Sequence, residues 1–217
     1  MPDAGAASPA VRDGNAGEPD VVAEREAVRR LIAAAVPEGL LRVVDERPDA
    51  HDALESLTES VLSDPDRVAA LNRTGLLADP PRLSLDQFAA LAAEALGTRY
   101  AAVSLVDDDA QVLVGWNTQD DGAQRTRPLE QSICKYAVAS GEPLIVDDTA
   151  EHPVLAASPV VQDGSVRSYA GIPLSDEHGH AVGTLCAWDS KPRHWTGSQI
   201  QILEDLTAVV RAKIFAG

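Results

Sequence analysis

Apolar positions recur at helical spacing in the first part of the chain. Two sets carry this pattern: Val28, Leu31, Ile32 and Ala35, and then Leu54, Leu57, Thr58 and Val61. A third helix is predicted to begin after Asp64, an N-cap residue followed by Pro65 at the first helical position, and to end before Gly75. Because these amphipathic helices are too small to form a core alone, we expect them to pack on the rest of the chain or on a second copy.

Two longer helices share one start signal. Ser84 and Gln87 have the spacing of a capping box, Gly97 follows the last apolar position, and Thr196 and Gln199 repeat the box before the C-terminal helix. The C-terminal helix has two neighbouring apolar stripes, namely Ile200, Leu203, Thr207, Val210 and Ile214, and Ile202, Leu206 and Val209. We expect one stripe to pack on a sheet and the other on a second copy, with the N-terminal helices as candidates to join that bundle.

Between these helices the apolar pattern becomes that of strands. The predicted elements are, in chain order, a hairpin of strand 101–106 and a strand ending at Trp116, a helix over 133–139, a strand over 143–146, and a second hairpin of 168–174 and 181–188. Residues 117–127 and the segment before 168 are predicted as loops. The pattern therefore predicts a mixed helix and sheet domain.

Composition restricts the setting of this domain. The chain has 217 residues, a formal net charge of -16 and no long basic face, which excludes nucleic acid and anionic membranes as expected partners. Neither a signal peptide nor a membrane span is predicted. Cys134 and Cys186 form no C-x-x-C motif, so they are predicted to be free thiols in a reducing compartment. We expect a cytoplasmic protein.

Three regions follow from these patterns. Residues 1–20 contain almost no large apolar side chain and are predicted to be a disordered tail. Residues 21–70 are predicted to be a helical extension and a candidate dimerisation element. Residues 71–217 are predicted to form the main domain.

Six stretches of that domain stand in a specific order: 71–77 (LNRTGLL), 102–107 (AVSLVD), 132–134 (SIC), 143–147 (PLIVD), 169–174 (YAGIPL) and 183–189 (GTLCAWD). Together they resemble the GAF domains, small sensory modules of bacterial signalling proteins. The resemblance implies an α+β sandwich: a central antiparallel sheet, the two long helices on one face and a ligand pocket on the other. The apolar stripes of both helices need such a sheet face, which agrees with the resemblance.

The resemblance implies a pocket with polar groups from the middle of the domain. Its expected lining is Trp116, Ser132, Cys134, Asp147 and Tyr169. A thiol at Cys134 could meet a chromophore, a metal or an oxidant, although a small buried side chain is the favoured interpretation. Covalent bilin attachment is disfavoured because Lys135, not His, follows Cys134. Free methionine sulfoxide reductase chemistry, known on this fold, is disfavoured because Cys186 lies inside a strand, away from thiol exchange.

Other chemistry has little support in the sequence. The five histidines are scattered except for His178 and His180 in a turn, so no metal site is predicted. Asp107, Asp108 and Asp109 lack the later Glu of an EF-hand loop and are predicted to be a turn. No hydrolase or phosphate-binding fingerprint is present. The sequence requires no cofactor and indicates no catalytic residue.

The sequence thus predicts a non-catalytic signalling module, homodimeric through its terminal helices, that binds a small molecule or a protein partner. Two alternatives stay open. In the first, the GAF-like domain is degenerate, its pocket is filled by side chains, and it acts only in protein interaction. In the second, Cys134 makes the protein a redox sensor or a sulfoxide reductase. A ligand sensor should keep a polar pocket, whereas a degenerate module should not.

Overall fold

The computed structural model describes residue 26 and residues 49–78, 82–118 and 123–215. The side chains of residues 49–51 and 82–84 are not described. The predicted tail over 1–20 and the first predicted helix, over 28–35, lie outside the described residues.

A six-stranded sheet forms the centre of the fold. Its strands are β1 (Tyr100–Val106), β2 (Ala110–Trp116), β3 (Thr126–Pro128), β4 (Leu144–Val146), β5 (Ser168–Ser175) and β6 (Ala181–Asp189). They lie in the order β3-β2-β1-β6-β5-β4, and all neighbours are antiparallel. Both predicted hairpins are confirmed, and so is the α+β class. The edge strand β3 falls in the predicted loop, because three residues that end in proline give no alternating pattern.

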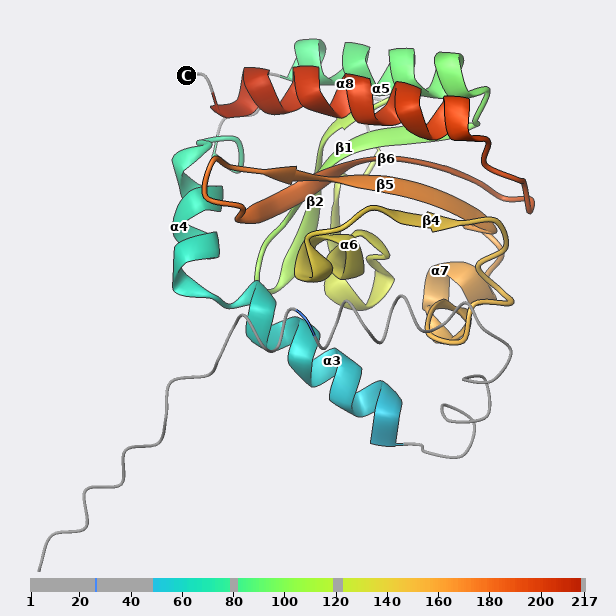
Figure 1. Ribbon diagram of the computed structural model, residues 1–217, viewed down its shortest axis with the longest axis horizontal. Helices are drawn as coiled ribbons and strands as arrows, with labels where there is room; N and C mark the ends of the chain where they lie inside the picture. The colour runs from blue at the N-terminus through green and yellow to red at the C-terminus, as the bar shows by residue number, and fades with distance from the viewer. Residues whose placement is uncertain (1–25, 27–48, 79–81, 119–122, 216–217) are drawn as a thin grey trace, which may run out of the picture.

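Two long helices cover one face of the sheet, as predicted. These are α5 (Arg82–Leu96) and α8 (Gly197–Phe215), which lie side by side above the strands (Figure 1). The capping box of α8 is confirmed, because Thr196 N–H donates to Gln199 Oε1 over 3.1 Å and Gln199 N–H donates to Thr196 Oγ1 over 3.3 Å. Helix α5 already begins at Arg82, so Ser84 lies inside the helix and the predicted start there is wrong.

Short elements cover the other face of the sheet. Helix α6 (Cys134–Ser140) lies against β6, and the predicted loop before β5 contains η2 (Leu155–Ala157) and α7 (Pro159–Gln162). A further 3-10 turn, η1 (Leu129–Gln131), precedes α6. The side chains between these elements and the sheet form a second apolar core, separate from the one under α5 and α8. The candidate site lies within this second core.

The described part of the N-terminal extension packs on the domain. Helix α3 (Asp49–Leu62) lies against α6, on the face opposite α8, and α4 (Pro65–Arg73) follows it along the side of the sheet (Figure 1). Within one chain, α3 therefore does not lie beside the terminal helices, and its joining a bundle between two copies stays a prediction. The buried guanidinium of Arg67 donates to the carbonyl oxygens of Leu62 and Val106, which ties the extension to the end of β1.

Candidate functional site

Two thiols meet inside the core between α6 and the sheet. Cys134 is the first residue of α6, and Cys186 lies in the central strand β6. Their sulfur atoms are 3.8 Å apart, and both cysteines are buried and free. The sequence-based argument that a strand position keeps Cys186 away from thiol exchange is therefore wrong, because α6 packs directly on β6.

Polar side chains converge on the Cys134 sulfur. The Tyr169 hydroxyl and the Gln111 Nε2 each donate to Cys134 Sγ over 3.2 Å. Gln111 is held in turn by a 2.8 Å hydrogen bond to Ser104 Oγ. Gly171 leaves space for the Tyr169 ring, because a Cβ at that position would collide with the phenol. Strands β1, β2 and β5 thus aim three polar groups at one thiol network.

This network makes the two thiols unequal. Hydrogen bonding with Cys186 lowers the pKa of Cys134 to about 6, while burial opposes that change and the Tyr169 hydrogen bond adds to it. The pKa of Cys186 is raised well above its usual value by its hydrogen bond with Cys134 and by burial. Cys134 is therefore the sulfur that ionises first, and Cys186 remains protonated beside it.

The cavity at the thiols is small. It has a volume of about 30 Å³, and both cysteines, Gln111 and Tyr169 line it. Bulky side chains fill the rest of this space, namely Leu113, Ile133, Val160, Val166 and Trp188. Pockets for small organic ligands usually measure roughly 300–1,000 Å³, whereas a cavity near 30 Å³ holds a molecule of about the size of water. A nucleotide or a tetrapyrrole does not fit in this conformation.

Two of the five predicted pocket residues meet at this cavity, namely Cys134 and Tyr169. Ser132 is buried, but its hydroxyl accepts a hydrogen bond from the Lys135 N–H in the first turn of α6. Trp116 packs on the edge of the same core without lining the cavity, and its buried Nε1 has no hydrogen-bond partner among the described residues.

The fifth predicted residue, Asp147, lies apart from the cavity. Its carboxylate accepts hydrogen bonds from the His194 Nδ1 over 2.7 Å and from the Trp195 N–H over 3.1 Å. These bonds lower the pKa of Asp147 against a partial desolvation that raises it. Asp147 therefore joins the end of β4 to the segment that leads into α8.

Cys186 and Gln111 are the site residues that the sequence reasoning missed. A usable signal existed for Cys186, because the alternation of β6 places residues 186 and 188 on one face and residues 185 and 187 on the other. In the structure Cys186 pairs with Gly171 of β5 and lies on the face that carries Tyr169. Gln111 gave no signal, since an isolated glutamine in a strand is common on surfaces.

Side chains of helix α3 bind α6 on the side that faces away from the sheet. The Glu55 carboxylate accepts from Lys135 Nζ and from the Tyr136 hydroxyl, each over 2.5 Å. Burial raises the pKa of Tyr136 above its usual range, and Glu55 raises it further, so the phenol stays neutral and donates. The extension is thus fixed to the helix that begins with Cys134.

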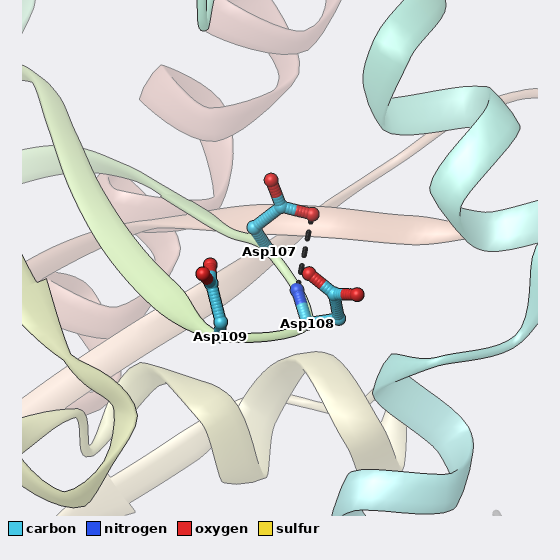
Figure 2. A group of neighbouring side chains, drawn as sticks. All are labelled: Asp107, Asp108 and Asp109. Atoms are coloured by element: carbon cyan, nitrogen blue, oxygen red, sulfur yellow. Dashed lines mark hydrogen bonds between the residues drawn. The ribbon is translucent and has the colours of Figure 1, made fainter.

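The acidic cluster at the first hairpin forms the turn that was predicted. Figure 2 shows Asp107, Asp108 and Asp109 between β1 and β2, where the Asp108 N–H donates to Asp107 Oδ1 over 3.0 Å. One carboxylate oxygen of each lies within 4.8 Å of the other two. Asp108 and Asp109 are exposed, and exposed carboxylates at this spacing are ordinary in turns.

A larger groove shares none of the residues that line the thiol cavity. It measures about 1150 Å³ and is formed by α4, the turn between β5 and β6, and the last part of α8. Its central carboxylate, Asp176, is already engaged by Arg73, His180 and the N–H groups of the turn. These hydrogen bonds stabilise the turn between β5 and β6, so the Asp176 carboxylate has a structural role. The thiol pair is therefore the stronger candidate for a functional site.

Comparison with known proteins agrees with this architecture. The family profile described as "GAF domain" matches residues 81–214. The cyclic di-GMP phosphodiesterase PA2567 of Pseudomonas aeruginosa is 29% identical over 151 residues, which are 68% of this chain and 25% of that protein. The chain thus spans about a quarter of the length of that relative.

One solved structure gives the same result for the fold, and a second structure is of a similar chain. The GAF domain of an Acinetobacter phosphoenolpyruvate-protein phosphotransferase superposes with a TM-score of 0.52 at 16% identity, covering 69% of this chain and 90% of that one. A free methionine-R-sulfoxide reductase from Neisseria meningitidis gives a TM-score of 0.47 at 26% identity, covering 76% and 88%. Among the described residues, none of the helices combines the length and apolar character of a membrane span.

Proposed function

This chain belongs to the GAF domain family, and we propose that within it the protein is a non-catalytic regulatory module that signals through protein contacts of its terminal helices. The observation that carries the proposal is the outer surface of α8 and α5. Ile202 and Val209 on α8 are 37% and 51% exposed, and Leu91 on α5 is 48% exposed. These are the large apolar side chains that the described surface presents to solvent.

The two apolar stripes of α8 have different surroundings. Leu203, Val210 and Ile214 are buried in the core on the sheet, whereas Ile202 and Val209 face outward and Leu206 is half-buried. An outward apolar stripe on a helix that already packs well is a typical contact for a second helix. We assign a second copy of the chain as the first partner, since the stripe repeats at the spacing of helix pairs.

Val209→Asp tests this assignment. Placing a carboxylate in the contact should weaken dimerisation by about tenfold or more, because the charge would be desolvated without a partner. Ala208→Asp is the matched control, since Ala208 is exposed on the same helix but lines the groove beside α4. Sedimentation at tens of micromolar should give a dimer for the parent and the control and a monomer for Val209→Asp. A monomeric parent protein would contradict the proposal.

The small interior cavity favours the alternative in which side chains fill the pocket between α6 and the sheet. At about 30 Å³ it excludes nucleotide-sized ligands unless α6 moves, which supports protein interaction over binding of a large small molecule. Native mass spectrometry of the purified protein distinguishes the two. A bound organic mass would favour a ligand sensor, and a bare polypeptide mass would favour the interaction module.

A thiol-dependent activity is the second candidate, and the 3.8 Å approach of the two cysteines is the observation that favours it. The phosphodiesterase activity named for the P. aeruginosa relative is not assigned to this chain, because the match covers only a quarter of that protein. The free thiols are consistent with the cytoplasm, which we propose as the location.

A further inference from the structure

We propose that Cys134 and Cys186 form an intramolecular disulfide inside the domain, with hydrogen peroxide as the oxidant. Two free thiols with sulfur atoms 3.8 Å apart lie between a short helix and the central strand of the sheet. A disulfide requires a separation of about 2.0 Å, so the sulfurs must approach by roughly 1.8 Å. We expect a side-chain rotation with a small shift of α6 to bring the two sulfurs together.

The surroundings select Cys134 as the sulfur that reacts first. Tyr169 and Gln111 both donate hydrogen bonds to its Sγ, whereas the Cys186 thiol itself donates, to the carbonyl oxygen of Ala102 over 3.5 Å. Donors aimed at a sulfur stabilise its thiolate, which is the form that attacks peroxides. Cys186 accordingly serves as the resolving thiol, and its proximity makes it available as soon as Cys134 has been oxidised.

The reaction balances without a further reactant. The Cys134 thiolate attacks one peroxide oxygen, so an S–O bond forms, the O–O bond breaks, and the leaving hydroxide takes up the proton that Cys134 released and departs as water. The sulfur of Cys186 then attacks the sulfur of Cys134, the S–O bond breaks, and the hydroxide leaves as water with the Cys186 proton. Two thiols lose two electrons in total, and the peroxide gains them.

The cavity suits an oxidant of this size. It adjoins both sulfurs, measures about 30 Å³, and has the exposed side chain of Gln131 at its edge. Hydrogen peroxide is only one oxygen atom larger than water, which such a cavity accommodates. A bulky disulfide such as glutathione disulfide does not fit there, so we expect it to react much more slowly.

The test is intact-mass analysis of the full chain. Reduced protein is exposed to hydrogen peroxide in small excess, then unfolded in N-ethylmaleimide to label the remaining thiols. The expected product carries no maleimide, is about 2 Da lighter than the reduced protein, and regains two alkylatable thiols after dithiothreitol. Protein that still takes up two maleimides, or that forms a cross-linked dimer instead, would overturn the proposal.

Variants assign the roles. Cys186→Ser should stop at a sulfenic acid that dimedone labels, while Cys134→Ser should give neither dimedone adduct nor disulfide. Tyr169→Phe keeps the ring and should slow oxidation about fivefold to tenfold, with a matching shift in the pH profile of Cys134 alkylation. Equal oxidation rates in Tyr169→Phe and the parent would remove Tyr169 as a positioning residue. The mass readout is intramolecular, so it stands or falls separately from the dimer.

Discussion

Single buried residues connect the stability of this protein to pH, and His152 is the clearest case. Burial lowers the pKa of His152 to about 4. Its Nδ1 accepts hydrogen bonds from the N–H groups of Val154 and Leu155, each over 3.3 Å, and so supports the turn before η2. Because burial disfavours the charged ring, the folded state binds the proton at a pH about 2.5 units lower than an ordinary histidine would, and the neutral ring is the form that accepts these bonds.

We predict that this histidine makes the fold less stable in mild acid. Between about pH 6.5 and pH 4 the unfolded chain binds the proton and the folded chain does not, so the free energy of unfolding rises with pH in this window. The stabilising contribution is complete above the window and is lost as the pH falls through it, by at most about 3 kcal/mol. Urea unfolding at several pH values measures the slope.

His152→Asn isolates that contribution, because an asparagine oxygen can accept the same backbone hydrogen bonds and does not titrate. Its pH slope should be flatter than that of the parent. His178→Asn is the matched control, since the His178 ring is exposed, and it should reproduce the parent slope. Identical slopes for all three proteins would show that His152 does not couple folding to pH.

At the scale of elements, α3 and α6 are joined by one carboxylate. Glu55→Gln should reduce the free energy of unfolding by about 1–3 kcal/mol, because it leaves the nearly buried ammonium of Lys135 without a charged partner. Glu59→Gln is the control on an exposed position of the same helix. Replacing Lys135 by Met in the Glu55→Gln background should recover much of the loss. Equal stability of Glu55→Gln and Glu59→Gln would contradict this role.

The elements also show what local sequence can specify. The helices α5 and α8 and both hairpins were predictable, because each is long enough to repeat its own hydrophobic period and to carry turn or cap residues. Strand β3 and helix α7 span three and four residues, too few for a period to emerge, and unlike the equally short β4 they contain no run of three apolar residues. The position of α3 depends on the contact of Glu55 with Lys135 of α6. These residues are 80 positions apart, so no local pattern in the sequence encodes their contact.

The residues of the candidate site likewise fall into those that the sequence could predict and those that depend on long-range packing. Cys134 and Tyr169 were predictable from the resemblance to GAF domains, because they belong to recognisable stretches of the chain. The same resemblance predicts Asp147 in the pocket, yet the hydrogen-bond partners of its carboxylate come from the segment before α8. The pairing of Cys134 with Cys186 arises only when α6 is packed on β6, and the order of the six strands determines that packing.

For the whole molecule, β6 connects the two proposed sites. Its residues Cys186 and Trp188 face the core beneath α6, whereas Leu185 and Ala187 belong to the core beneath α5 and α8. Closing the disulfide would pull the start of α6 toward this strand. Because both cores are closely packed, a displacement of β6 caused from the α6 side should also shift α5 and α8, which pack on its other face.

We therefore predict that oxidation changes the dissociation constant of the dimer by about fivefold or more, the lower end of ordinary coupling between two sites. Sedimentation of reduced and peroxide-oxidised protein over a concentration series measures it, and Cys186→Ser should show no change on treatment. Coupling is reciprocal, so the disulfide must form at a different equilibrium position in Val209→Asp than in the parent dimer. Equal dissociation constants in both redox states would mean that the thiol pair and the terminal helices act independently.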